Sequence, residues 1–320
     1  MNWPVDLPAF ARLRGWYNAS STMANTGGIR IGIVHPQLYP QTSGGEGPVV
    51  ETVAALAAEA ALSAIEVTHV RDELTRARLK LLLSSGSMRV AYNAEPSILR
   101  HGWNLNAEDQ SARAEAVAGL RSEMEEAHFL GAKLFCVMSG PDTAPEGRAA
   151  ARGRLVESLQ RLGDEGGRLG ITVALELYDR DVEQKRLIGP VAEAIDVAKQ
   201  VKRDNVGLTL DLAHLILLKE NVLNAVSDAR NFVVHAQISN CVLADGHPAR
   251  GDQHPAFGTE GSLAGVGEVA GFLKALDRYG FWKKPNGGWL TIEVRPREEE
   301  YSSVVLAGAL RVVQEAQATL

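Results

Sequence analysis

Four polar residues sit at or near the ends of four consecutive apolar runs in the second half of the chain. They are Glu176, Asp211, His235 and Glu293. Carboxylate and imidazole groups are costly to bury unless they are paired or bound to a cation. Three carboxylates brought together also repel one another unless a divalent cation neutralises them. Taken singly, each residue fits an ordinary ion pair or a hydrogen-bonded core position. Together the four predict a metal site, with a donor set that suits Mn²⁺, Mg²⁺, Co²⁺ or Zn²⁺.

Further candidate residues follow the same runs. The strings Asp211-Leu-Ala-His214 and Asp252-Gln-His254 place acid and imidazole at short spacing, so both pairs could aim at one ion or one substrate. We expect His214 and His254 to move protons to and from substrate oxygens, because imidazole titrates near neutrality. The expected substrate-binding residues are His69, Asp252, Arg295 and His35. For each of these, ordinary local hydrogen bonding or ion pairing remains the alternative.

These residues need a scaffold that brings strand ends together. Eight short apolar runs alternate with eight longer segments of helical spacing. The expected strands are 29–34, 64–70, 88–94, 132–138, 171–178, 206–212, 232–238 and 289–294. The expected helices are 48–61, 71–84, 107–130, 147–169, 190–203, 219–230, 265–280 and 298–318.

Near-continuous apolar runs are typical of parallel strands buried on both faces. The pattern predicts an α/β protein, a (β/α)₈ TIM barrel, whose active site lies at the carboxyl ends of the strands. We expect an N-terminal extension (1–28), a single barrel domain (29–320) and a long loop between the seventh strand and its helix. The alternative is an open doubly wound sheet. It is disfavoured because HPQLYPQTSGGEG, which follows the first strand, is not the GxGxxG turn of such folds.

Composition narrows the function classes. Of the 320 residues, 45% are hydrophobic, and this content excludes a disordered chain. The formal net charge of −6 means that the chain lacks the excess of basic residues typical of proteins that bind nucleic acid or anionic membranes. Two cysteines, Cys136 and Cys241, cannot form a disulfide framework, and the chain begins without an apolar signal segment. We therefore expect a cytoplasmic protein that binds neither nucleic acid nor membrane.

The pattern resembles the xylose-isomerase-like TIM barrel superfamily, the group of sugar phosphate isomerases and epimerases that includes AP endonuclease family 2. In its ketose 3-epimerases and inosose-processing members, Glu, Asp, His and Glu on the last four strands hold one divalent metal. The resemblance places those ligands at Glu176, Asp211, His235 and Glu293. The family's substrate-contacting D-x-x-H histidine matches His214.

The chain also departs from two branches of this superfamily. The ketose epimerases carry a second glutamate six residues after the first ligand, where this chain has Val182 followed by Glu183. The endonuclease IV branch holds three zinc ions, and His69 and the two Asp/His strings match it, but no histidine closes the third or fourth run. The insertion NCVLADGHPARGDQHPAFGTEG looks like the loop of C-glycoside deglycosidase catalytic subunits, which implies a lyase acting on a 3-keto sugar conjugate.

The sequence thus predicts a divalent-metal-dependent isomerase or epimerase of a keto-sugar or related polyol, acting by proton abstraction through a metal-stabilised enediolate. Glu176 and Glu293 are the expected base and acid, one Mn²⁺ is the expected cofactor, and the partners are a small sugar or sugar conjugate and further copies of the chain. A lyase on the same scaffold, inosose dehydratase-like or with a small second subunit, is the main alternative. A zinc phosphodiesterase and a non-catalytic barrel subunit also remain open.

Overall fold

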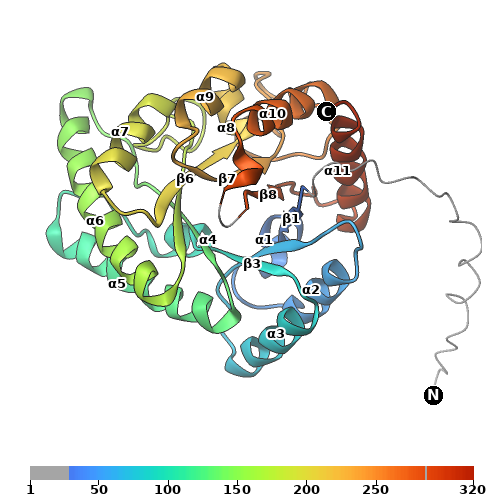
Figure 1. Cartoon of the computed structure of the whole chain (residues 1–320), viewed down its shortest axis with the longest axis horizontal. Helices are drawn as coiled ribbons and strands as arrows, with labels where there is room; N and C mark the ends of the chain where they lie inside the picture. Colours follow the sequence, from blue (N-terminus) through green and yellow to red (C-terminus); the bar gives the residue numbers. More distant parts are fainter. Residues whose placement is uncertain (1–28, 285–286) are drawn as a thin grey trace, which may run out of the picture.

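Eight parallel strands form a closed barrel in the computed structural model, which describes residues 29–284 and 287–320 (Figure 1). Each strand pairs with its neighbours in chain order, and the first pairs with the last through Ile31 and Leu290. The strands are β1 (Ile31–Val34), β2 (Ala64–Val67), β3 (Arg89–Asn93), β4 (Leu134–Met138), β5 (Thr172–Glu176), β6 (Val206–Asp211), β7 (Val233–Ile238) and β8 (Trp289–Ile292). The predicted (β/α)₈ fold is confirmed.

A ring of helices surrounds the barrel, and each of the eight expected helices is present (Figure 1). They are α2 (Val49–Ala57), α3 (Glu73–Ser85), α5 (Gln110–Leu130), α6 (Arg148–Leu169), α7 (Val191–Val201), α9 (Val222–Ala229), α10 (Val266–Arg278) and α11 (Ser302–Gln317). Three short helices that the sequence did not predict follow strand ends directly: α1 (His35–Leu38), α4 (Glu95–His101) and α8 (Leu212–Leu217). These short helices bring backbone and side chains over the open end of the barrel.

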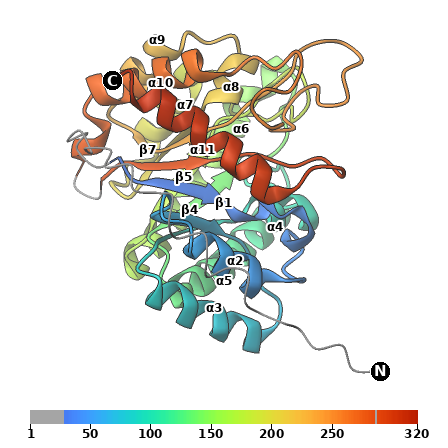
Figure 2. The same ribbon diagram turned by 90° about the vertical axis from the view of Figure 1, so that its right-hand side faces the viewer.

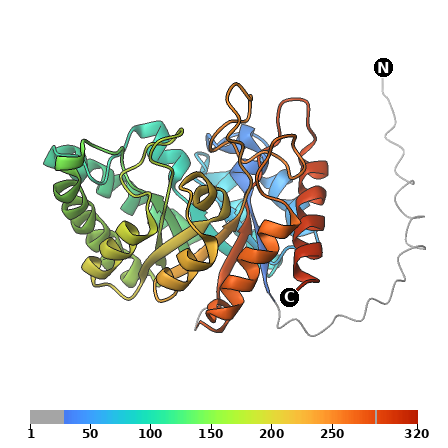
Figure 3. The same ribbon diagram turned by 90° about the horizontal axis from the view of Figure 1, so that it is seen from above.

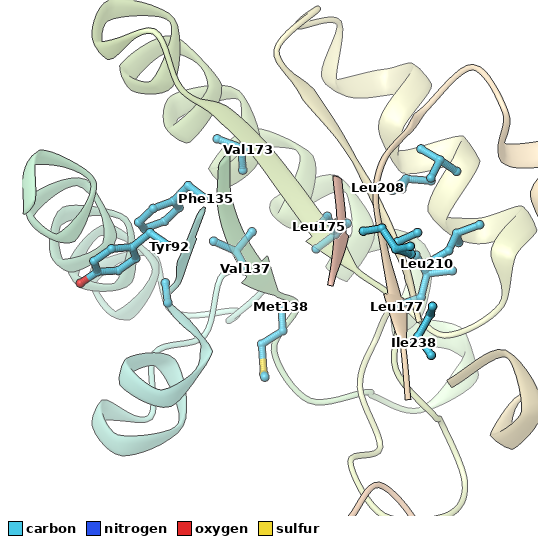
Figure 4. Close-up of a cluster of buried hydrophobic side chains, with 14 of the residues drawn as sticks. Tyr92, Phe135, Val137, Met138, Val173, Leu175, Leu177, Leu208, Leu210 and Ile238 are labelled. Atoms are coloured by element: carbon cyan, nitrogen blue, oxygen red, sulfur yellow. The ribbon is translucent and has the colours of Figure 1, made fainter. Parts of the chain in front are cut away.

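The two faces of the strands are packed differently. The outward face carries large apolar side chains that pack against the helices, with Tyr92 stacked on Phe135 at a ring-centroid distance of 5.3 Å (Figure 4). The inward face at the closed end carries mainly small residues, among them Ala64, Ala91 and Ala174. A barrel interior has room for only a few large side chains, so these small residues let the strands close.

The carboxyl ends of the strands all point to one side, from which the longest loops project (Figure 2). The segment 239–265, drawn orange after β7, is ordered by bridges from Val242 to Arg250 and to Ser262. It lies beside the segments that follow β1 and β8, with which it shares a surface groove (Figure 3). The expected long loop after β7 therefore belongs to the rim of the open end.

Two further expectations concern the N-terminal residues and the absence of membrane-spanning helices. The expected N-terminal extension, 1–28, lies outside the described residues. Among the residues that are described, no helix is both long and apolar enough to cross a bilayer.

Gly207 tests the packing of the interior. A Cβ at this position would lie 2.6 Å from the Phe232 carbonyl oxygen and 2.6 Å from Val234 Cγ1. Gly207→Ala should lower the free energy of unfolding by about 1–3 kcal/mol, the usual effect of overpacking a core. Urea denaturation followed by circular dichroism measures this change.

The matched control is Gly271→Ala on α10, where no atom lies within 4 Å of the added Cβ. Alanine in an exposed helix interior is stabilising relative to glycine by about 1 kcal/mol. Equal destabilisation by both substitutions would contradict the packing described for Gly207.

Candidate metal centre

Acidic and amide side chains crowd the interior at the carboxyl end of the barrel. Glu176 ends β5, Asp211 ends β6, Gln237 lies on β7 and Glu293 follows β8; none is more than 2% exposed. Asp211 pairs in register with Gln237, and Gln237 pairs with Thr291. Because Ala236 and Ile238 pack in the outer core, alternation along the strand turns Gln237 inward.

Many oxygens in this group lack a hydrogen-bond partner among the described residues. They are both oxygens of Glu176, Asp211 Oδ2, Glu293 Oε2 and the amide oxygen of Gln237, whose nitrogen is also unpaired. A buried polar atom without a partner costs roughly 1–3 kcal/mol, so native proteins rarely leave several together. Oxygen donors gathered in this way fit a hard divalent cation.

The electrostatics point the same way. Burial raises the pKa of Glu293 to about 8, against the lowering effect of nearby His254. Burial and the neighbouring Glu95 raise the pKa of Glu176 well above its usual range. Ligand atoms of Asp211, His254 and Glu293 lie within 4.8 Å of one another, a spacing that could hold one ion. A bound cation would let these carboxyls ionise.

Hydrogen bonds from neighbouring elements fix the orientation of these acids. Asp211 Oδ1 accepts from Ser239 Oγ at 2.5 Å and from the backbone N–H of His214 at 2.9 Å, which caps α8. Gln37 on α1 donates to Glu293 Oε1 at 3.0 Å. Asp211 and Glu293 thus each have one oxygen held by the protein and one oxygen without a hydrogen-bond partner.

Two histidines and an aspartate form a second cluster beside the acids. Asp252 Oδ1 lies 2.6 Å from His214 Nε2 and 3.0 Å from His254 Nε2, and His214 Nδ1 donates to the Leu177 carbonyl at 2.6 Å. Burial alone would lower the pKa of His214, but Asp252 and Asp211 raise it well above its usual value. Burial lowers the pKa of His254, but the charges of Glu293 and Asp252 outweigh this effect and raise the pKa to about 9.

The backbone at His254 is unusual. Its φ of 45° lies in the left-handed region, which a non-glycine residue adopts rarely and mostly where surrounding contacts impose it. Its carbonyl accepts from the Arg295 N–H at 2.7 Å, and the Asp252 N–H donates to Glu183 Oε2 at 2.6 Å. The loop after β7 is thereby fastened to the segments after β5 and β8, with His254 aimed inward.

His235, the expected imidazole ligand, lies deeper in the barrel than the acids. It faces the interior, but Gln237 lies two residues further toward the open end, about 6.6 Å along the strand at 3.3 Å per residue. His235 Nε2 lies 3.1 Å from Glu66 Oε1 and 2.9 Å from Thr291 Oγ1, and its Nδ1 lies 3.2 Å from Thr209 Oγ1. Both ring nitrogens are engaged below the acids, so the position beside Asp211 belongs to Gln237 instead.

His69 and His35 also lie away from the acids. Thr68 takes the buried position after β2, whereas His69 turns outward and its Nδ1 lies 2.7 Å from Glu126 Oε2 on α5. His35 opens α1 and turns toward α2, where its Nε2 lies 2.8 Å from Thr52 Oγ1; burial lowers its pKa to about 4. Neither side chain lines the cavity described next.

A cavity of about 400 Å³ lies near these acids. Its walls include Gln37 and His254, which both contact Glu293, together with Tyr178, Asp252 and Arg295. Arg295, expected at the site, also borders the neighbouring groove of about 540 Å³. The sequence analysis missed Gln37, Glu95, Tyr178 and Gln237. Of these, only Gln237 could have been found from the sequence, because it lies two residues after His235 and therefore faces the same side of the same strand.

Several known proteins are similar to this chain in sequence or in structure. A 2-oxo-tetronate isomerase of Pectobacterium atrosepticum is 22% identical over 242 residues, covering 75% of this chain and 84% of the relative. A D-psicose 3-epimerase of Agrobacterium fabrum is 24% identical over 216 residues, covering 65% and 72%. The structure of 3-keto-D-glucoside 4-epimerase from E. coli matches with a TM-score of 0.64 and 18% identity, over 89% and 99% of the two chains.

The buried pair of Glu66 and His235 gives a prediction about stability. Glu66→Ala removes one member of a fully buried hydrogen-bonded pair, so it should lower the free energy of unfolding by about 3–5 kcal/mol. Glu46→Ala, which breaks an exposed pair with Arg71, should change it by less than about 1 kcal/mol. Chemical denaturation of both variants makes the comparison, and equal effects would contradict a supporting role for the layer below the acids.

The family assignment rests on a match across most of the barrel. The xylose isomerase-like TIM barrel family matches residues 54–307, from α2 into α11. The closed barrel, the acids at its open end and the similar isomerases and epimerases all agree with that match. This chain belongs to the xylose isomerase-like TIM barrel family.

Proposed function

We propose that this chain is a divalent-metal-dependent isomerase or epimerase of a keto-sugar or related polyol. The observation that carries the proposal is the set of buried oxygens without a hydrogen-bond partner on Glu176, Asp211, Gln237 and Glu293. They lie near a cavity whose wall residues Gln37 and His254 contact Glu293. These four residues would hold the ion, with Mn²⁺ as the expected metal. The relatives named as 2-oxo-tetronate isomerase and D-psicose 3-epimerase support a small hydroxy-ketone substrate.

The metal, when bound, would supply positive charge that stabilises the enediolate formed as a C–H proton leaves. The side chains of the protein do the rest. Glu176 on β5 and Glu293 after β8 stand on different strands at the open end, so one would take a proton from carbon and the other return it. His214 and His254, both held by Asp252, can exchange protons with substrate oxygens.

A lyase remains the second candidate, because one observation favours it. The cavity and the neighbouring groove share Pro40, Gln253 and Arg295, so the open end has room for a group attached to the sugar. The same proton abstraction followed by loss of a β-substituent would then give elimination. In that case a sugar conjugate is the substrate, and a small second subunit is an additional expectation.

Metal binding is the first test. Wild-type protein is titrated with Mn²⁺, and the free ion is measured by electron paramagnetic resonance. The wild type should bind one ion per chain. Gln237→Leu and Glu293→Gln should each weaken binding at least about tenfold, since even outer partners of a ligand change affinity by 10–100-fold. His235→Gln should bind Mn²⁺ as the wild type does. Loss of binding in His235→Gln, with normal binding in Gln237→Leu, would contradict the ligand set.

Proton exchange is the second test. The Mn²⁺-loaded enzyme is incubated in D₂O with D-fructose, D-psicose, 2-oxo-tetronate and a 3-keto-glucoside, and the products are examined by NMR and mass spectrometry. Deuterium at the carbon next to the carbonyl, with conserved product mass apart from deuterium, is the expected result. Loss of water or of an aglycone would favour the lyase. No exchange with any of the four substrates would contradict the proposed chemistry.

A further inference from the structure

Glu95 is a buried acid at the cavity that neither the metal set nor the proton transfers use. It is the first residue of α4, two residues after the end of β3, and it lines the cavity although it is only 6% exposed. Asn93 fixes the turn, because its Oδ1 accepts from the Glu95 backbone N–H at 2.9 Å. The side chain therefore has a defined place at the wall.

The surroundings of Glu95 leave one oxygen unused. Its carboxyl interacts with the Tyr178 side chain and with Glu176, yet Oε1 is buried without a hydrogen-bond partner among the described residues. A buried oxygen without a partner, on a residue that lines the cavity, fits a hydrogen bond to a molecule bound there.

A hydroxyl group satisfies such an oxygen best. A hydroxyl both donates and accepts, so it pairs with a carboxyl in either protonation state. A carboxylate or phosphate would bring a second acceptor, and a methylene would leave the oxygen unpaired in a desolvated place. Arg295 and Gln253 also line the cavity and carry N–H donors, which would pair with acceptor atoms of the same molecule.

We propose that Glu95 is a specificity-determining residue that binds a free hydroxyl of the substrate, beyond the atoms that face the metal ligands. This inference rests on the proposed function and narrows it to substrates that carry a hydroxyl at that point, as a ketohexose does. Sites that hydrogen-bond a substrate hydroxyl discriminate strongly against the analogue that lacks it.

The test combines hydroxyl deletion with mutation. Deuterium exchange in D₂O is measured for D-fructose and for its 4-deoxy, 5-deoxy and 6-deoxy analogues, with Mn²⁺-loaded wild type, Glu95→Ala and Glu95→Gln. Wild type should lose at least about 100-fold in kcat/KM on one deoxy analogue. Glu95→Ala should lose a similar factor in kcat/KM on D-fructose. On that same deoxy analogue the mutation should lower kcat/KM little further, because the analogue already lacks the hydroxyl that Glu95 binds. Glu95→Gln, which keeps an acceptor oxygen, should fall between the two.

Two controls separate the alternatives. Mn²⁺ affinity should be unchanged in both Glu95 variants, and a loss would instead make Glu95 a metal ligand and overturn the proposal. Glu123→Gln, a change in a similarly buried glutamate on α5 that lies outside this cavity, should behave as the wild type in every assay.

The outcomes are distinguishable from failure of the proposed function. Equal losses by Glu95→Ala on D-fructose and on every deoxy analogue, or no loss at all, would overturn the role of Glu95 while leaving the enzyme's chemistry intact. Absence of exchange by the wild type on D-fructose would overturn the ketohexose-type substrate that the inference requires, before any variant is compared.

Discussion

The repulsion and desolvation of carboxyl groups buried side by side dominate the open end of this barrel. Glu176, Asp211 and Glu293 are taken out of water together, and each keeps at least one oxygen without a partner among the described residues. Such an arrangement is stable only if the acids carry protons or share a cation. The rest of the open end follows from that constraint, because the surrounding loops either orient these acids or place histidines and a cavity above them.

The inward-facing side chains of the barrel form successive layers, and these layers hold the acids in place. An apolar cluster with Ala64, Ala91, Ala174, Leu134 and Trp289 fills the closed end. The Glu66–His235 pair with Thr291 and Thr209 forms a polar layer above it, and the acids with Gln237 form the next layer. In the polar layer the hydrogen-bonding groups satisfy one another, whereas in the layer of acids they do not. This difference in hydrogen bonding, rather than residue type, distinguishes the two layers.

The fold could be predicted from the sequence because its signals are repeated and strong. Apolar runs and helical segments alternate eight times, and errors at one boundary do not change the architecture. The three carboxylates could also be placed, since each ends an apolar run. Side-chain direction was harder. A two-residue repeat puts both His235 and Gln237 inside the barrel, and only the register with Asp211 decides between them. His69 and His35 lie just past strand ends, where the two-residue alternation of the strand no longer sets the direction of a side chain. Glu95 begins a short helix that the sequence pattern did not predict.

One measurement addresses the central claim directly. Crystals of the protein soaked in Mn²⁺ can be examined by anomalous scattering at the manganese absorption edge. The account predicts a single peak within coordination distance of oxygens from Glu176, Asp211, Gln237 and Glu293. A peak beside His235, Glu66 and Cys136 instead, or acids that stay unliganded at saturating manganese, would contradict it.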